Sequence, residues 1–400
     1  MRVGGIPCVT RLVRLFELEG VHDIVVVVER PCAPEDFGAR DRRTKLRVLQ
    51  ASGAVPLGEL VEPDLGLTGY CLFAAADFVV DRRIIELLLA RGRPAIVQPT
   101  AEGSQEIAVG LLPPERLGIL AGGSAGDAEI ERIDPRSLDT FSEEMRGPVP
   151  IFLHRVSGAR SAAELGRALI RATQKHVMDA PARWLDPPFE NVLLAWLAPT
   201  RVTPNQVTFA CTGIGLLAAV LLAKGAFVAA FPLMYLVEWL DGVDGKLARL
   251  RLEYSALGEW ESYFDFLYEN AWWFALTWWF YGTKGAAALL WGGLLLGGNL
   301  ADEIAYTLGH RWLGCPLDLL GRFDEHFRLI AGRRNIYVAM LLLCAVAGRL
   351  YEGFVAAGAW AVCTGVVHSA RLLWAARHRA SLAAAGRRPG RQAPAANGDR

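Results

Sequence analysis

Asp241-Gly-Val-Asp244-Gly245-Lys-Leu-Ala248-Arg249 lies between two strongly apolar stretches of a 400-residue chain. On a helix, carboxylates three or four residues apart share one face, and Asp241 and Asp244 have this spacing. Glu261 and Asp265 follow about one helical hairpin later, with the same property. Charged carboxylates at the edge of a hydrocarbon layer are costly unless they are compensated. Two such faces together form an oxygen cage for hard divalent cations such as Mg2+, so the pattern predicts a metal site that handles phosphates at a membrane.

The pattern D-x-x-D-G-x-x-A-R resembles the signature of the CDP-alcohol phosphotransferase (CDP-alcohol phosphatidyltransferase) family. These integral membrane enzymes of phospholipid biosynthesis move a substituted phosphate from a CDP-alcohol to an acceptor alcohol and release CMP. In the family, eight residues, a Gly and two Asp at four-residue intervals follow, and Gly258 falls in place. In strict register the acidic positions would be Ser262 and Phe266. We assign them one residue earlier, to Glu261 and Asp265, because this keeps the i, i+4 geometry.

The resemblance implies Mg2+ or Mn2+ as cofactor, and four acids suit two ions. The predicted metal ligands are Asp241, Asp244, Glu261 and Asp265. Asp265 matches the family's general base, which would take the proton from the acceptor hydroxyl. Glu in place of Asp at position 261 predicts either an altered metal preference or a loss of activity, because the carboxylate moves by about one methylene.

The resemblance also implies a nucleotide site, to which we assign Asn205, Gly245, Ala248, Arg249 and Ser255. Gly245 and Ala248 lie on the face of Asp241, where their small size would let a nucleotide approach the backbone closely. The guanidinium fork of Arg249 can pair with a phosphate oxygen. Asn205 and Ser255 match positions that contact cytidine diphosphate in the family.

The apolar residues concentrate after about residue 205 and predict a six-helix transmembrane domain, residues 206–380. The predicted spans are 206–223, 225–247, 256–281, 285–307, 334–350 and 353–376. Thr203-Pro-Asn-Gln-Val-Thr208 places an N-cap and an early Pro at the first span, as in many members of the family. Basic residues gather at one side, which predicts a multi-pass protein of a bacterial-type inner membrane, with carboxylates and both termini in the cytoplasm.

The flanking segments and the composition complete the organisation. Residues 176–205 read as a linker carrying an amphipathic surface helix over 189–197, and 381–400 as a disordered tail. Lysine plus arginine and aspartate plus glutamate both number 42, so no basic excess points to nucleic acid. Seven scattered cysteines without CxxC spacing predict reduced thiols. No secretory signal opens the sequence, so we expect the N-terminal part in the cytosol.

Residues 1–175 predict an α/β domain with a doubly wound sheet, because helical and strand-like stretches alternate. Predicted helices are Val9–Leu18 and Asp81–Arg91, and predicted strands are 24–28, 70–73, 106–110 and 149–153. The order is similar to that of a sugar-nucleotidyltransferase, whose metal-binding strand end resembles Ala75-Ala-Asp77-Phe-Val-Val-Asp81. The glycine-rich loop that cradles nucleotide phosphates in such a domain is missing. We interpret the domain as a degenerate nucleotidyltransferase, and a misplaced start codon would give the same appearance.

Several alternatives stay open at this point. Arg328, Arg333 and Arg334 could bind an anionic acceptor, or could face anionic lipid headgroups. The pairing of two such domains resembles bifunctional enzymes that make di-myo-inositol phosphate precursors, which suggests an inositol-phosphate-like acceptor or donor. Gly293-x-x-x-Gly297 could pack helices within the monomer or in a homodimer. The main rival function is a catalytically impaired membrane pseudoenzyme that binds nucleotide or lipid and recruits a partner. A transporter fits poorly, because no inverted repeat is visible.

Overall fold

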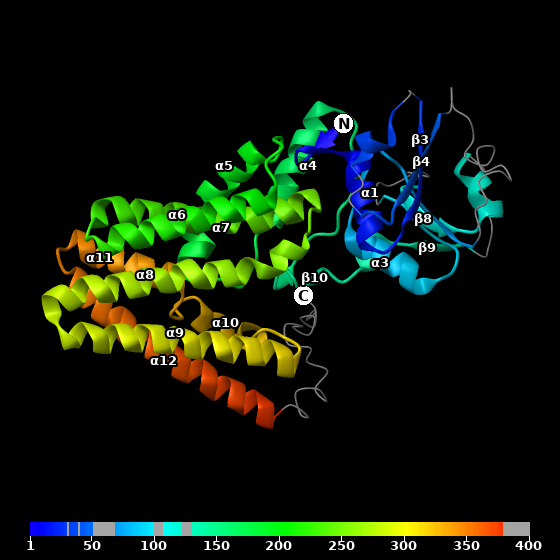
Figure 1. The fold of residues 1–400 in the computed structure, drawn as a ribbon. Helices are drawn as coiled ribbons and strands as arrows, with labels where there is room; N and C mark the ends of the chain where they lie inside the picture. Colours follow the sequence, from blue (N-terminus) through cyan, green and yellow to red (C-terminus); the bar gives the residue numbers. More distant parts are fainter. Residues whose placement is uncertain (30–31, 39–40, 51–68, 100–106, 122–129, 379–400) are drawn as a thin grey trace, which may run out of the picture. The chain divides into compact units, whose positions relative to one another are not determined.

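The protein is represented by a computed structural model that describes residues 1–29, 32–38, 41–50, 69–99, 107–121 and 130–378 (Figure 1). It divides into two compact units. Unit 1 comprises residues 1–140, 149–172 and 250–253, and unit 2 comprises 141–148, 173–249 and 254–400. The predicted tail, 381–400, lies outside the described residues.

Unit 1 combines short strands with helices. Its helices are α1 (Cys8–Leu18), α3 (Arg82–Arg91) and α4 (Ala159–Ala172). Its strands are β1 (Arg2–Val3), β2 (Ile6–Pro7), β3 (Asp23–Val28), β4 (Lys45–Gln50), β5 (Cys71–Ala74), β6 (Phe78–Val80), β7 (Ala95–Val97), β8 (Val109–Leu112), β9 (Glu131–Ile133) and β12 (Leu153–Arg155). Asp81 begins α3 as its N-cap by accepting a hydrogen bond from the Arg83 backbone N–H at 3.0 Å.

The strands of unit 1 form several small sheets of mixed direction. The largest has the order β5-β8-β7-β9, with β8 antiparallel to both neighbours and β7 parallel to β9. Separately, β3 and β4 pair in parallel, and β6 pairs with β12 in antiparallel fashion. The α/β content is as predicted, but a single doubly wound parallel sheet is not confirmed. The strand predicted over 149–153 was wrong, because pairing begins only at Leu153, opposite Val80.

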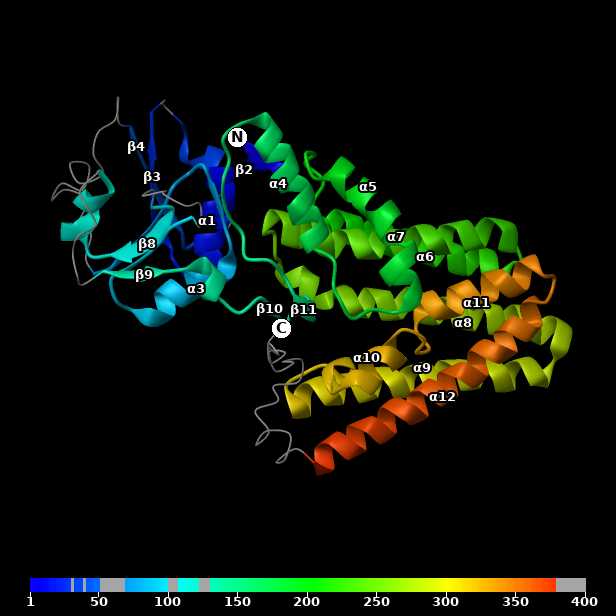
Figure 2. The same cartoon turned by 180° about the vertical axis from the view of Figure 1, so that it is seen from behind.

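Unit 2 is mostly helical (Figures 1 and 2). Its α-helices are α5 (Pro187–Leu197), α6 (Pro204–Ala223), α7 (Phe227–Arg251), α8 (Glu261–Lys284), α9 (Ala286–Leu313), α10 (Arg322–Arg328), α11 (Arg334–Val346) and α12 (Leu350–Arg377). Shorter elements are β10 (Phe141–Ser142), β11 (Gly147–Pro148), the π-helical turn Pro181–Leu185 and the 3-10 turns Ala256–Trp260 and Leu317–Leu319. The last residues of α7 belong to unit 1.

The predicted start of the first apolar helix is confirmed. Thr203 caps α6 in a reciprocal capping box with Gln206, which satisfies two backbone donors that a helix start leaves open. The amphipathic helix predicted over 189–197 is also present, as α5. Each remaining apolar segment contains a helix, although the helix predicted over 334–350 ends at Val346.

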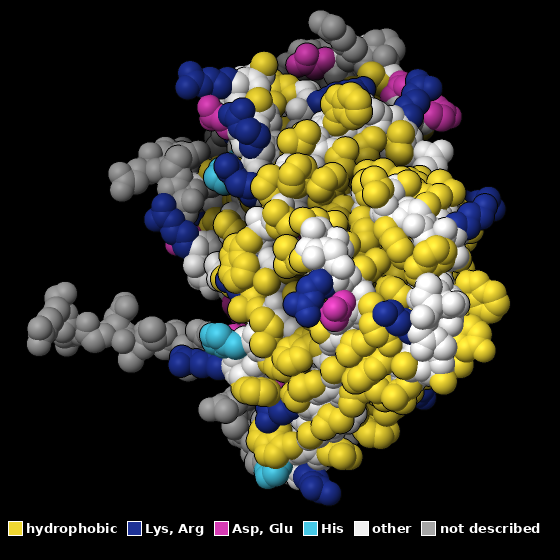
Figure 3. Space-filling view, turned by 90° about the vertical axis from the view of Figure 1, so that its left-hand side faces the viewer, with side chains coloured by type: hydrophobic (Ala, Val, Ile, Leu, Met, Phe, Trp, Pro, Cys, Tyr) yellow, Lys and Arg dark blue, Asp and Glu magenta, His cyan; other side chains and the backbone are white. Residues whose placement is uncertain are grey.

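Three helical stretches among the described residues are long and apolar enough to cross a membrane. They are Pro204–Ala223, Arg322–Val346 and Leu350–Arg377. The predicted number of six spans is not confirmed by this measure. Large apolar side chains such as Phe274, Trp278 and Val346 are exposed on the helices, and Figure 3 shows one face covered mostly by hydrophobic side chains. Such a surface is typical of contact with lipid or with a partner.

Aromatic residues and glycines build the core of unit 2. Tyr268, Trp272 and Trp273 of α8 are fully buried, and Trp272 donates to the carbonyl of Gly215 in α6 at 2.7 Å. A β-carbon on Gly298 would lie 2.5 Å from the Ala361 backbone, so α9 and α12 touch through their main chains. Both ribbon views show these two helices side by side.

Candidate metal centre

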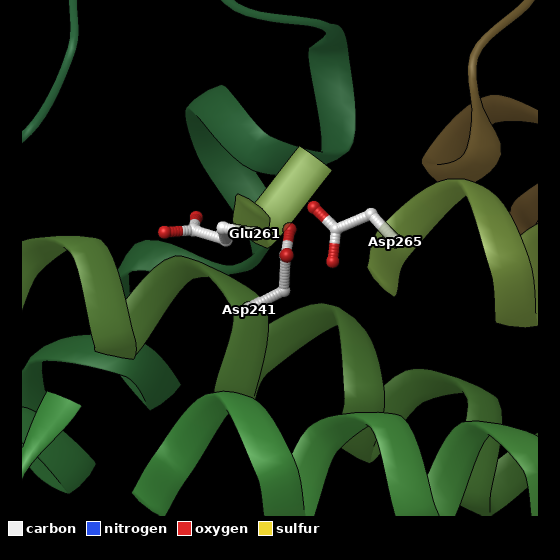
Figure 4. Close-up of side chains that lie close together, drawn as sticks. All are labelled: Asp241, Glu261 and Asp265. Atoms are coloured by element: carbon white, nitrogen blue, oxygen red, sulfur yellow. The ribbon is translucent and has the colours of Figure 1, made fainter. Parts of the chain in front are cut away.

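Helices α7 and α8 bring three of the predicted carboxylates together. One carboxylate oxygen each from Asp241, Glu261 and Asp265 lies within 4.8 Å of the others. Asp241 stands between the other two side chains and faces Asp265 (Figure 4). Asp241 lies on α7, Glu261 is the first residue of α8, and Asp265 follows one turn later. All three are partly accessible, so a ligand can reach the group from outside the helix core.

Asp244 lies on the buried side of α7, outside this group. Its Oδ2 accepts a hydrogen bond from the Thr208 hydroxyl of α6 at 2.6 Å, and its Oδ1 accepts from the Gly245 backbone N–H at 2.6 Å. The side chain is 2% exposed. The helical spacing put Asp244 on the face of Asp241, but the hydroxyl of Thr208 directs its carboxylate toward α6.

Arg334 supplies a positive charge beside the cluster. Its Nη2 donates to Asp241 Oδ2 at 2.5 Å, and its Nε donates to both carboxylate oxygens of Glu238 at 3.0 and 3.1 Å. It also donates to the hydroxyl of Tyr268, which in turn donates to Asp265 Oδ1 at 3.0 Å. A buried guanidinium with these partners can offset the charge of the carboxylates around it.

The sequence analysis missed Glu238 and Tyr268 as members of the site. Glu238 precedes Asp241 by three residues and Tyr268 follows Asp265 by three, so both share a helical face with a predicted ligand. That spacing was the available signal. The hydrogen bonds of Glu238 and Tyr268 depend on Arg334 of α11, which is far away in the sequence.

The residues assigned to nucleotide binding form two contacts, one between Ser255 and Asn205 and one between Arg249 and Gly245. Ser255 caps the turn that precedes α8, and its hydroxyl donates to Asn205 Oδ1 at the start of α6 at 2.8 Å. Arg249 folds back over Gly245, where a β-carbon would lie 3.3 Å from its Nη1. Its Nη2 donates to the Thr173 carbonyl at 3.2 Å. Ala248, like Gly245, is half-buried on α7.

A further cation, Lys175, lies in the electrostatic neighbourhood of Arg249 and Glu261 and was not predicted. Burial first, and then the guanidinium groups of Arg249 and Arg146, lower the pKa of Lys175 to about 8. The ammonium group therefore changes its charge in mildly alkaline solution. No motif marked this residue, which is the last of the predicted α/β domain, residues 1–175.

Helix α5 packs directly on the helix that carries the acidic motif. A β-carbon on Gly242 would lie 1.9 Å from Glu190 Oε1, so a larger residue here would displace the Glu190 carboxylate. Glu190 accepts a hydrogen bond from Lys246 Nζ at 2.5 Å, and both side chains are almost completely buried. Gly242 and Lys246 of the motif therefore position α7 against α5.

The other two arginines considered for an acceptor also face carboxylates of unit 2. Arg333 Nε lies 3.6 Å from Asp302 Oδ2, and its guanidinium lies 4.2 Å from the centre of the Tyr306 ring. Arg328 Nε lies 3.6 Å from Asp318 Oδ2. These contacts place both guanidinium groups inside the helical unit, where their charge is compensated.

The donor set fits a divalent cation. Asp241, Glu261 and Asp265 offer only carboxylate oxygens, which Mg2+ and Mn2+ prefer over nitrogen or sulfur. Mg–O bonds of about 2.1 Å would require the three oxygens to approach within about 4.2 Å of one another. The present separations of up to 4.8 Å need only small side-chain adjustments to meet that limit.

The part of the chain that carries the acidic cluster is similar to known proteins. Residues 201–296 match the model of the CDP-alcohol phosphatidyltransferase family. The matched CDP-alcohol phosphatidyltransferase region includes all the residues assigned to metal and nucleotide, and it confirms the predicted resemblance there. The chain is also 33% identical over 173 residues to a bifunctional IPC transferase and DIPP synthase of Rubrobacter xylanophilus. That match covers 41% of this chain and 35% of the relative's length.

Proposed function

We propose that this protein is a membrane CDP-alcohol phosphotransferase, which transfers a substituted phosphate from a CDP-alcohol to an acceptor alcohol and releases CMP. The observation that carries the proposal is the meeting of Asp241, Glu261 and Asp265 within the matched region. A divalent cation, Mg2+ or Mn2+, held by these carboxylates would neutralise the diphosphate and stabilise charge on the oxygens of the transferred phosphate. A second ion would need Asp244 to turn away from Thr208.

The side chains around the cluster have distinct proposed roles. Asp265 takes the proton from the acceptor hydroxyl, and the hydrogen bond from Tyr268 orients the carboxylate for this step. The acceptor oxygen then bonds to the β-phosphorus, and the bond from that phosphorus to the bridging oxygen breaks as CMP leaves. Asn205 and Ser255 bind the cytidine part, and Arg249 pairs with a phosphate oxygen above Gly245 and Ala248.

We further propose an inositol-phosphate-like acceptor. The support is the name of the Rubrobacter relative, together with the resemblance to enzymes that make di-myo-inositol phosphate precursors. For the location we propose a bacterial-type inner membrane, with the site facing the cytoplasm. The remaining candidate is the impaired pseudoenzyme. It is favoured by the two engaged carboxylates, Asp241 on Arg334 and Asp244 on Thr208.

The deciding experiment measures CMP release by the full chain in detergent, with a panel of CDP-alcohols and acceptors and with Mg2+ or Mn2+. Asp265→Asn should lower turnover by about 10²- to 10⁴-fold, the usual contribution of a general base. Glu352→Gln, a change at an exposed acid of α12 outside the cluster, is the matched control and should retain activity. Metal-dependent binding of a CDP-alcohol without CMP release would favour the pseudoenzyme. If the protein neither binds any CDP-alcohol of the panel nor releases CMP, that result would count against the proposal.

A further inference from the structure

The C-terminal end of α7 is embedded in unit 1. Residues 250–253 belong to unit 1, although the residues on both sides of them belong to unit 2. Leu250 is 1% exposed, and its side chain lies so close to Gly4 that a β-carbon there would be 2.8 Å from Leu250 Cδ1. The side chain of Leu252 packs against the hydrophobic core of unit 1.

Two buried arginines of α1 hold this segment. Arg11 donates to the carbonyl of Leu250, and Arg14 Nη1 donates to the carbonyl of Arg251 and to Glu253 Oε1, both at 2.8 Å. The last carbonyls of a helix lack partners within the helix, and cationic side chains there are favourable. Arg11 and Arg14 therefore cap α7 from a segment 239 and 237 residues away in the chain.

We call residues 250–253 the clamped segment, and these residues together with Arg11 and Arg14 the clamp. The backbone of the clamped segment is strained. Leu252 has a φ of 54°, a left-handed conformation that residues other than glycine rarely adopt. Such a conformation persists only where the surroundings impose it. The guanidinium groups on one side and the core contact of Leu252 on the other supply that constraint.

The clamp lies between the two halves of the acidic cluster along the chain. Asp241 precedes it on the same helix, and Ser255, which caps the turn leading to Glu261, follows it closely. Glu261 and Asp265 lie one residue earlier than in the family pattern, so the connection between the two acidic pairs is one residue shorter than in that pattern. A short connection with one end held leaves little freedom in how α8 starts relative to α7.

We infer that Arg11, Arg14 and Glu253 are positioning residues, through which unit 1 sets the separation of Asp241 from Glu261 and so the affinity of the cluster for a divalent cation. This rests on the metal role assigned under the proposed function. Unit 1 thereby contributes to the membrane site without supplying a ligand of its own. Groups that orient metal ligands typically affect metal affinity by about 10- to 100-fold when they are removed.

The test measures Mn2+ binding directly, by the electron paramagnetic resonance signal of free Mn2+, on the full chain in detergent. Arg14→Gln and Glu253→Gln should each weaken Mn2+ binding by about tenfold or more. The loss in the double variant should be smaller than the sum of the two single losses, since both changes break the pair of Arg14 with Glu253. Arg47→Ala removes a half-exposed ion pair with Asp23 elsewhere in unit 1 and should bind Mn2+ like the wild type.

Folding and function are separated by further measurements. Thermal unfolding identifies variants that remain folded, and if Arg14→Gln does not fold, Glu253→Gln and Arg11→Gln decide. Wild-type Mn2+ affinity in folded clamp variants would overturn the inference, even if CMP release occurs. Weaker Mn2+ binding in the variants would support it, even if no donor yields CMP and the proposed function fails. A wild type that binds no Mn2+ would overturn both.

Discussion

At the residue scale, the candidate site depends on how buried charges are compensated. Arg334 lies between Glu238 and Asp241 and is 9% exposed, so removing it leaves carboxylates without their cation. We expect Arg334→Gln to cost about 3–5 kcal/mol of stability, as is typical when one partner of a buried ion pair is removed. Arg334→Gln combined with Glu238→Gln should recover part of that loss, because the second change removes the unpaired carboxylate. Thermal unfolding in detergent checks both.

The outcome for the double variant is the sharper part of this prediction. If Glu238→Gln gives no recovery in the Arg334→Gln background, the pairing between α7 and α11 does not explain the loss. The Glu238→Gln variant alone is the necessary reference, since double-mutant cycles isolate a pairwise contribution only when both single variants are measured.

Lys175 provides a prediction on pH. Its folded-state pKa is about 8, below the ordinary value of 10.5, because burial and neighbouring arginines disfavour the charged form. Between these two values the unfolded chain binds more protons than the folded one, so this residue makes the protein more stable as pH rises. The midpoint of thermal unfolding of the wild type relative to Lys175→Met should therefore increase between pH 7.5 and pH 10. A constant difference over this range would contradict the assignment.

At the element scale, the contact between α9 and α12 depends on particular glycines. Gly298→Ala would bring a β-carbon within 2.5 Å of the Ala361 backbone, so the helices would have to separate. We expect a loss of about 1–3 kcal/mol, the typical cost of overpacking. Gly297→Ala is the matched control, because nothing lies within 4 Å of a β-carbon at that position and alanine favours the helix. Unfolding midpoints that fall equally in both variants would contradict this account.

The same comparison clarifies the Gly293-x-x-x-Gly297 pattern. A β-carbon at either position would meet nothing within 4 Å, whereas Gly292 faces Thr277 and Gly298 faces Ala361. The close helix contacts within unit 2 are therefore made by Gly292 and Gly298, which flank the pattern. A homodimer through the outer pair stays a prediction.

At the scale of the whole molecule, the apolar helices predict stable membrane integration. Stretches such as Pro204–Ala223 and Leu350–Arg377 are long enough to cross the hydrocarbon layer. We expect the protein to remain in the membrane fraction after washing with alkaline carbonate and to be released only by detergent. Fractionation followed by immunoblotting checks this, with a known peripheral protein as the control. Release by carbonate would indicate binding at the membrane surface.

The sequence by itself determined the local features of this protein. It located the start of α6 at Thr203, the helices that carry the acidic motif and the oxygen-only donor set, because capping, periodicity and i, i+4 spacing act over a few residues. It also predicted the resemblance to the CDP-alcohol phosphatidyltransferase family, whose model matches residues 201–296. The sequence did not predict the mixed sheets of unit 1. A β-branched run does not specify which strand pairs with it or in which direction.

Only the tertiary structure decided which of the acidic side chains meet. Asp244 shares a helical face with Asp241, but its carboxylate is bound by Thr208 of another helix. Arg334 reaches Asp241, and Arg14 reaches Glu253, across long separations in the chain. A carboxylate near the end of a helix takes whichever donor the packing of neighbouring helices brings within about 3 Å. That choice depends on the positions of whole elements, which the spacing of residues along one helix does not contain.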